Sequence, residues 1–161
     1  DPRWGVSSHY YQINSQRRLD ELTPLQFFAT NKSGVSGNAI DDPVSIYRLL
    51  RQNTELMSRS VEKGVYAVAF APDEFSVELL QDLKGMPNLE QIQLADCQIS
   101  DDDLRYLAGL PKLVGLGLNG TGISMAGLKQ LAVLPALETI YYNEGELTKA
   151  ELLLLGTESK D

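Results

Sequence analysis

The chain has 161 residues and a mass of 17.8 kDa, which fits one domain or one domain with an appendage. Its apolar share of 43% and charged share of 22% exclude a disordered chain, and no apolar run is long enough to cross a membrane. One cysteine excludes a disulfide framework, one histidine leaves little room for zinc or histidine-based catalysis, and a net charge of −8 argues against a nucleic-acid partner.

Residues 1–40 are predicted to form an N-terminal arm with one short helix. Thr23 followed by Pro24 is typical of a helix start. Near the beginning, Trp4 and Tyr10 flank His9, the only histidine. This aromatic cluster indicates either an anchor onto the body of the protein or a binding site, and the residues alone leave both open.

Residues 41–64 are predicted to form a capping helix. Asp42 before Pro43 is typical of a helix N-terminus, and the apolar residues that follow lie mostly on one stripe. We expect the helix to run from about Pro43 to Glu62, to end at Gly64, and to cover the open end of the next segment.

The composition changes near residue 64. Residues 1–64 carry a charge balance of +1 and six leucines, whereas residues 65–161 carry −9 and twenty leucines. The second part is therefore an acidic, leucine-rich segment, and residues 41–161 are predicted to form one domain behind the arm.

A repeat of 24 residues runs through this segment without gaps. Its blocks cover residues 66–89, 90–113, 114–137 and 138–161. The first half of each block alternates as a strand does, as in Ile92-Gln93-Leu94, and the second half spaces its leucines by three, as in Leu104 and Leu107. Each block therefore predicts one strand followed by one helix.

A hydroxyl residue marks the helix start in every block, at Ser76, Ser100, Ser124 and Thr148. Acidic residues three positions after Ser100 and Thr148 complete predicted capping boxes. The acidic run 101–103 then has two interpretations, a solvated helix start or a metal site, and the first needs only the favourable interaction with the helix dipole.

Two middle blocks carry the spacing that resembles a known family. Leu89-x-x-Ile92-x-Leu94-x-x-Cys97-x-Ile99, and its counterpart from Leu113 to Ile123, are similar to the leucine-rich-repeat segment, in its bacterial, ribonuclease-inhibitor-like form with 24-residue repeats. The resemblance covers residues 65–161 and implies an α/β fold, a right-handed solenoid with a short parallel sheet inside, helices outside and an N-terminal helical cap. It also implies that Cys97 and Thr121 are ladder residues that point inward after the strand and hold the loops of neighbouring repeats. We therefore interpret Cys97 as a buried structural thiol.

Strand alternation places one set of side chains on the inner, concave face of the sheet, which relatives of this fold use most often to bind partners. Alanines and glycines make up much of this face, and its strands were predicted to carry no charge. The predicted contact residues of this face are Gln91, Gln93, Asn119, Thr139, Tyr141 and Asn143. Either a partner or the N-terminal arm is expected to cover the face, and a partner bound there should show weak salt dependence.

Acidic residues gather at the carboxyl ends of the strands, at Asp73, Glu74, Asp96, Glu144 and Glu146. This acidic rim indicates either a surface that attracts a basic partner or a solvated face. The last strand, Thr139 to Asn143, is expected to present an open edge with Tyr141 and Tyr142, which predicts a homodimer through that edge or a protecting role for the two tyrosines.

The residues therefore predict a non-catalytic protein–protein interaction module without metal or cofactor. An accessory or assembly subunit held by the acidic rim and the C-terminal edge strand is the alternative, and an enzyme with its site in the arm is a third hypothesis. No segment predicts membrane insertion. The chain begins at Asp1, which is compatible with removal of an N-terminal signal, so the compartment is open between cytoplasmic and exported.

Overall fold

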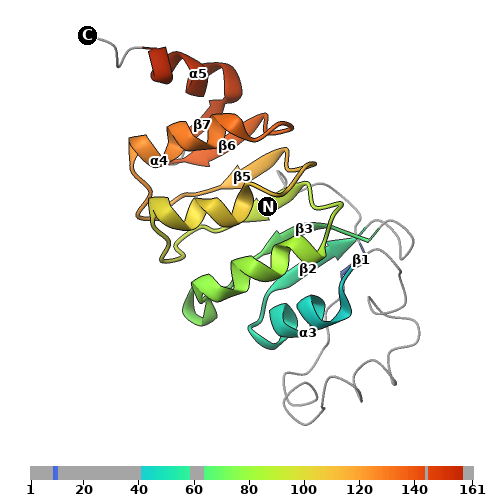
Figure 1. Cartoon of the computed structure of the whole chain (residues 1–161). Coiled ribbons are helices and arrows are strands. Elements are labelled where there is room, and N and C mark those ends of the chain that lie inside the picture. The colour runs from blue at the N-terminus through green and yellow to red at the C-terminus, as the bar shows by residue number, and fades with distance from the viewer. Residues whose placement is uncertain (1–8, 11–40, 59–63, 144, 158–161) are drawn as a thin grey trace.

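The fold is mixed α/β, built on one open seven-stranded sheet with the strand order β1-β2-β3-β4-β5-β6-β7 (Figure 1). The computed structural model describes residues 9–10, 41–58, 64–143 and 145–157. The strands are β1 (His9–Tyr10), β2 (Glu55–Ser58), β3 (Val65–Ala69), β4 (Gln91–Gln93), β5 (Gly115–Gly117), β6 (Thr139–Tyr142) and β7 (Gly145–Thr148).

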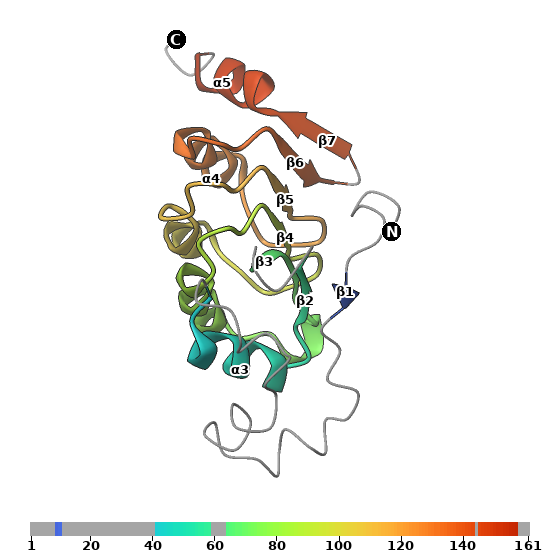
Figure 2. The same cartoon turned by 90° about the vertical axis from the view of Figure 1, so that its right-hand side faces the viewer.

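The helices α3, η5, η6 and α4 lie on one side of this sheet, as Figure 2 shows by viewing the strands nearly edge-on. Those labelled η are 3₁₀ helices. The helical elements are α3 (Pro43–Arg51), η4 (Pro72–Glu74), η5 (Val77–Gly85), η6 (Asp101–Leu107), α4 (Met125–Gln130), η7 (Leu131–Val133) and α5 (Lys149–Thr157).

Strands β3 to β6 are parallel, and each residue pairs with the one 24 positions later. Val68 pairs with Ile92, Ile92 with Leu116, and Leu116 with Ile140. These pairs match the spacing of the sequence repeat. Because the side chains at these positions face the helices, the repeat places an aliphatic residue of every strand in one core, where all four are fully buried.

The core continues behind the strands through the leucines of the helical halves. Leu104 and Leu128, which occupy the same position in their blocks, are 5% and 0% exposed. Their burial agrees with the predicted inward face of each helix. Full burial of one leucine side chain contributes about 1.5–3 kcal/mol, so this repeated layer is the main source of stability.

The helical halves of the first two complete blocks are tighter than the sequence suggested. Elements η5 and η6 are 3₁₀ helices, and only the third block forms a short α-helix at this point, α4. A 3₁₀ helix has three residues per turn, so leucines spaced by three align along one side of it. The spacing that predicted a helix therefore fits this geometry directly.

Both predicted capping boxes are present. Asp103 Oδ2 accepts from the backbone N–H and the hydroxyl of Ser100, each at 2.8 Å. Glu151 Oε2 accepts from the backbone N–H of Thr148 at 2.6 Å, and the Thr148 hydroxyl accepts from the Glu151 amide at 3.3 Å. Ser76, by contrast, makes no side-chain cap.

The predicted capping helix is correct at its start and wrong in its length. Asp42 caps α3 by accepting from the Ser45 amide at 3.1 Å, but the helix ends at Arg51 rather than near Glu62. Asn53 adopts a left-handed conformation with φ 53°, and the next amide returns to the Leu49 carbonyl at 3.1 Å. Asparagine is the usual alternative to glycine at such a helix end.

The chain after α3 turns back as a strand instead of continuing the helix. In β2, Leu56 pairs antiparallel with Val68 and adds its side chain to the core. The cap on the first parallel strand is therefore a strand together with a helix. Helix α3 itself packs against η5 of the first repeat, as expected.

Gly64 has a different role from the helix stop that was predicted. It lies immediately before β3 with φ +71°, and a Cβ at this position would lie 2.9 Å from the Asp41 carboxylate oxygens. Asp41 is buried and accepts from the Val65 amide at 2.8 Å. The glycine thus allows the Asp41 carboxylate to hold the start of β3.

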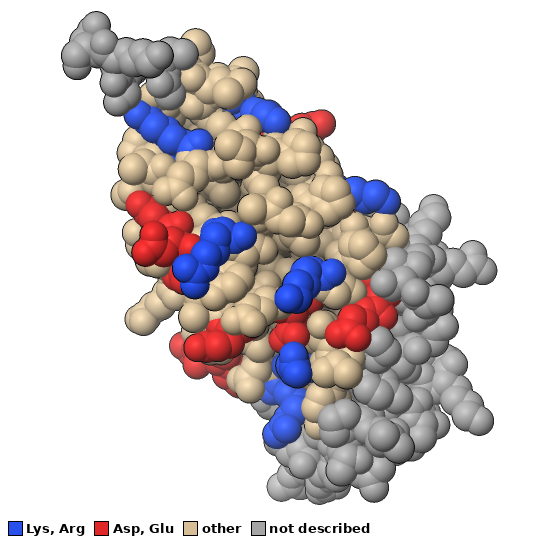
Figure 3. Space-filling model, in the orientation of Figure 1, with Lys and Arg blue, Asp and Glu red and all other residues tan. Residues whose placement is uncertain are grey.

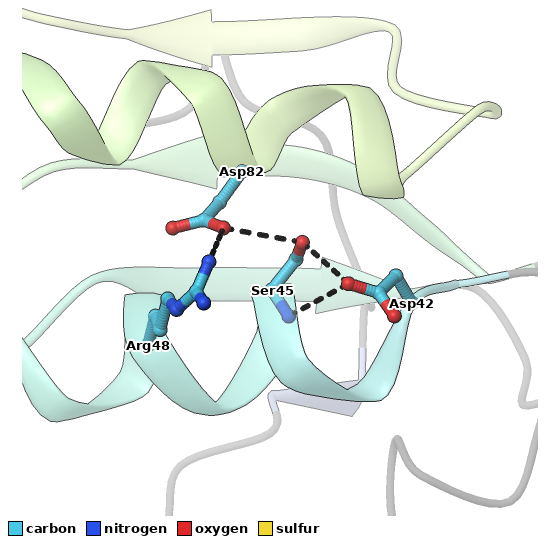
Figure 4. A network of polar contacts seen from close by, with 4 residues as sticks. All are labelled: Asp42, Ser45, Arg48 and Asp82. Atoms are coloured by element: carbon cyan, nitrogen blue, oxygen red, sulfur yellow. Dashed lines mark hydrogen bonds and ion pairs between the residues drawn. The ribbon is translucent and has the colours of Figure 1, made fainter.

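A four-residue polar network joins α3 to η5 (Figure 4). Asp82, which is 6% exposed, accepts from the Arg48 guanidinium at 3.1 Å, and the Ser45 hydroxyl lies between Asp42 at 2.8 Å and Asp82 at 3.3 Å. Because a hydroxyl has one proton, Ser45 donates to one carboxylate at a time and favours Asp42 on distance. Arg48 therefore provides the main compensation for the buried Asp82.

The predicted open edge at β6 is wrong. Strand β7 pairs antiparallel with β6, from Thr139 opposite Thr148 to Tyr142 opposite Gly145. Only two residues connect the strands, and Asn143 has φ 50°, which such tight hairpins favour. The C-terminal edge of the described sheet is therefore β7. Tyr142 packs against the core and donates its hydroxyl to the Ile123 carbonyl at 2.9 Å.

Within the predicted N-terminal arm, His9 and Tyr10 form β1 and pair with Ser58 and Met57 of β2. The short helix near Thr23 and the rest of the arm lie outside the described residues. Whether the arm is a separate unit from residues 41–161 stays a prediction.

Candidate binding face

The side of the sheet opposite the helices, here called the strand face, consists of two rows of side chains that cross the strands. Residues paired directly across neighbouring strands point to the same side of a sheet, so the pairing fixes both rows. The first row is Met57, Ala67, Gln91, Gly115, Thr139 and Thr148. The second row is Glu55, Ala69, Gln93, Gly117, Tyr141 and Glu146.

The two glycines of β5 provide space for the glutamine side chains of β4. A Cβ added to Gly115 would collide with the Gln91 carboxamide, and one added to Gly117 would collide with the Gln93 carboxamide. The Gln93 side-chain oxygen also accepts from the Ala95 amide at 3.1 Å. The centre of the strand face is thus a shallow surface of carboxamides lying over backbone.

The two rows differ in accessibility. Met57 and Ala67 are 5% and 0% exposed and form a small buried cluster with Tyr66, so the first row is closed at that end. The second row is accessible at both ends, because Glu55 and Glu146 are exposed. Ala69, Gln93 and Tyr141 between them are half-buried. The second row is the open track across the sheet.

The structure brings five of the predicted contact residues onto one side of the molecule, and the sixth to its margin. Gln91, Gln93, Thr139 and Tyr141 lie in the two rows, and Asn119 follows β5 directly. Asn143 is exposed in the hairpin turn, where its left-handed backbone has a structural function. Whether these residues bind a partner stays a prediction.

The expectation of a face without charge is correct for β3 to β6 and wrong for the face as a whole. Strands β2 and β7, which sequence reasoning missed, add Glu55 beside Ala69 and Glu146 beside Tyr141. Neither glutamate forms an ion pair with a described residue. The available signals were Asn53 as a helix terminator and the Asn143–Gly145 stretch as a tight hairpin.

The acidic rim is present in the parts of it that the structure describes; Glu144 lies outside them. Asp73 and Asp96 are exposed, and Glu74 accepts from the Asn53 amide nitrogen at 2.7 Å. Asp96 has φ 61°, and Gly120, its counterpart 24 residues later, has φ 69°. The same left-handed turn therefore follows both strands.

Positive charge is absent from the described strands. All Lys and Arg side chains among the described residues belong to helices or, at Lys112, to the turn after η6. They are Arg48, Arg51, Lys84, Arg105, Lys112, Lys129 and Lys149. Figure 3, which looks onto the helix side, shows Lys and Arg spread over that surface among acidic groups. The strand side is thus acidic, and the helix side is mixed.

The lone cysteine lies in the core rather than at the strand face. Cys97 is 1% exposed, and its burial, together with the nearby Asp96 charge, raises the pKa of its thiol to about 11. A thiol with this pKa is protonated at neutral pH and unreactive as a nucleophile. Thr121, 24 residues later, donates its hydroxyl to the Leu118 carbonyl at 2.7 Å. This bond satisfies a loop carbonyl, which is the kind of role predicted for a ladder residue.

Two hollows open on the helix side. One of about 250 Å³ lies between η6 and α4–η7 and is lined mainly by Leu104, Leu131, Val133 and Leu134. The other, of about 500 Å³, lies between α3 and η5 beside Arg48. Within the described ranges, no group of three His, Cys, Asp or Glu side chains is arranged to hold a metal ion. In the same ranges, no helix is both long and apolar enough to cross a membrane.

The chain was compared with protein-family models, with curated proteins and with solved structures. None of the three comparisons gives a match. The interpretation of this chain therefore depends on its repeat, its sheet and the two rows of the strand face.

Proposed function

We propose that this chain is a right-handed leucine-rich-repeat solenoid with an N-terminal cap and that it acts as a non-catalytic module that binds another protein. The support for the solenoid is the pairing of residues 24 apart along β3 to β6. Helices α3, η5, η6 and α4 on a single side of the sheet also support it (Figure 2). A repeat of this length has to stack on its neighbours to bury its apolar half.

The observation that carries the binding function is the open second row of the strand face. It offers half-buried Gln93 and Tyr141 on a floor lowered by Gly117. Tyrosine gives a large contact area for little loss of conformational entropy, and a carboxamide both donates and accepts hydrogen bonds. These groups suit recognition of a polypeptide better than catalysis.

Site-directed photo-crosslinking tests this function. A photoreactive side chain at Gln93 is expected to capture a protein partner from native extract, whereas the same group at Gln81, an exposed glutamine on η5, is not. Tyr141→Ala should then weaken binding of the captured partner by about five- to thirtyfold, the effect of a contact worth about 1–2 kcal/mol. Equal capture from both positions would contradict binding at the strand face.

A second candidate is an assembly subunit held at its C-terminal end, either by a second copy or by another chain. The outer edge of β7 has no neighbouring strand in the described sheet, and Leu153 and Leu154 on α5 are 53% and 64% exposed. Open sheet edges and exposed leucines favour association. The acidic rim would add attraction for a basic surface.

A further inference from the structure

The second row ends in a carboxylate on each side. It runs from Glu55 on β2 through Ala69, Gln93, Gly117 and Tyr141 to Glu146 on β7. Both glutamates are exposed, and the four positions between them carry no charge. The two end strands are antiparallel additions that lie outside the parallel strands of the repeat.

The length of this row follows from sheet geometry. Five strand-to-strand steps separate β2 from β7, and neighbouring strands lie about 4.8 Å apart, so the glutamates stand about 24 Å apart. An extended polypeptide rises about 3.3–3.4 Å per residue, so about seven residues cover this distance.

The charge distribution determines which partner fits. Asp73 and Asp96 lie close to the same side of the sheet, and the described Lys and Arg residues all belong to the helix layer or its turns. A cationic segment is therefore attracted to the strand side and is repelled by part of the helix side (Figure 3).

The floor of the row favours an extended backbone over a helix. A segment that crosses the strands cannot pair with their backbone, so its own N–H and C=O groups need side-chain partners. The Gln91 and Gln93 carboxamides, which lie flat over β5, and the Tyr141 ring lie along its path. A docked helix would instead need a broad apolar floor, and Met57 and Ala67, the apolar residues of the first row, are already buried.

We propose that the second row binds an extended protein segment that carries two basic side chains about seven residues apart with uncharged residues between them. Glu55 pairs with one basic side chain and Glu146 with the other, while the Gln93 carboxamide and Tyr141 contact the uncharged stretch. This inference rests on the proposed function, because it specifies the partner of the same face.

Two synthetic peptides and the full chain test this spacing. One peptide has an arginine at each end of six uncharged residues, and its matched control has the same composition with the arginines adjacent. The spaced peptide is expected to bind at low salt with a Kd at least threefold lower than that of the control, as measured by fluorescence anisotropy. Its affinity should fall as salt is raised, because both ion pairs are exposed to solvent.

Charge-neutralising variants locate the contact. Glu55→Gln and Glu146→Gln should each raise the Kd of the spaced peptide about two- to fivefold, the usual range for exposed ion pairs. Glu78→Gln is the matched control, because Glu78 is an exposed glutamate on η5 of the helix side, and it should leave the Kd unchanged. Equal binding of both peptides, no binding of the spaced peptide, or no effect of either row variant would overturn the inference.

The failure of this inference can be told apart from failure of the proposed function. Partners captured through Gln93 that require Tyr141 but are unaffected by both glutamate variants would leave strand-face binding intact and remove the basic pair. Partners that require neither Tyr141 nor the glutamates would remove both.

Discussion

Glycines at two positions of this chain answer to different physical constraints. At Gly64 the backbone is left-handed, and the space for a side chain is occupied by the buried Asp41 carboxylate. At Gly117 the space is occupied only by the end of the flexible Gln93 side chain, which can move away at small cost. The same substitution therefore has different consequences at the two sites.

Gly64→Ala is expected to lower the free energy of unfolding by about 1–3 kcal/mol, because it adds a left-handed alanine and displaces Asp41. Gly117→Ala should stay within about 1 kcal/mol of the parent, since alanine is better tolerated than glycine in a strand. Urea denaturation of both variants measures the difference. Equal losses at the two positions would contradict the assignment of Gly64.

Asp101 connects two repeats through a helix cap. Its carboxylate accepts from the Ser124 amide at 2.8 Å and from the Ser124 hydroxyl, which itself accepts from the Gly127 amide at 3.3 Å. These bonds, the hydroxyl bond foremost, hold the pKa of Asp101 below its usual value of 3.8. A carboxylate of η6 thus stabilises the N-terminus of α4 in the next repeat.

This contact predicts a pH dependence. Because the folded pKa lies below the unfolded value, the contribution of Asp101 is complete above about pH 4 and is lost as the pH falls below it. Asp101→Asn should therefore reduce stability at pH 7 and flatten its decline between pH 5 and about pH 3. Asp102→Asn, at the exposed neighbouring carboxylate, is the control, and thermal melts across this range decide. A parallel decline in parent and Asp101→Asn would count against the cap.

Among the elements, those that obey the repeat were predictable from sequence, and those that end it were not. Leu104 and Leu128 are buried as their spacing requires, and Val68, Ile92, Leu116 and Ile140 pair in the expected order. Periodicity specifies such positions because each recurs in the same environment. Strands β2 and β7 occur once each, so no recurrence marks them.

The errors at the site have the same origin. The helix prediction extended beyond Arg51 because the apolar stripe continues through Met57, yet Leu56 and Met57 are strand residues that both become buried. Tertiary pairing with β3 there outweighs the helical pattern. As a result, Glu55 and Glu146 were absent from the predicted face, although most of its central residues were identified.

Helix α5 contains four consecutive leucines with unequal environments. Leu152 is 1% exposed, whereas Leu153 and Leu154 are more than half exposed. Leu152→Ala is expected to cost about 2–5 kcal/mol of unfolding free energy, and Leu153→Ala should change it by no more than about 0.5 kcal/mol. Chemical denaturation of the two variants tests whether α5 docks through Leu152. A larger loss at Leu153 would mean that the helix packs through its other side.

For the whole molecule, the two sides of the sheet have separate roles. The helix side is held together by packing and by local polar contacts such as Arg48 with Asp82 (Figure 4). The strand side contributes little to the core, so Gln93 and Tyr141 can be replaced with small cost in stability. Variants on this side are therefore suitable for testing binding without loss of the fold.

The two ends of the sheet are closed to different degrees, and this difference predicts association. At one end, β2 is paired with β1 and α3 packs against η5, whereas at the other β7 has no outer neighbour in the described sheet and Leu153 and Leu154 are exposed beside it. Two copies can pair β7 with β7 antiparallel around a two-fold axis and cover the leucines of both.

Sedimentation velocity of the full chain should then show a dimer whose fraction increases with concentration. Leu153→Glu combined with Leu154→Glu should raise the dimer dissociation constant at least tenfold, because it places charges in the apolar contact. Val44→Glu is the control, since Val44 is 41% exposed on α3 at the opposite end of the sheet. A parent chain that remains monomeric at millimolar concentration would exclude the β7 dimer and leave this edge for a different chain.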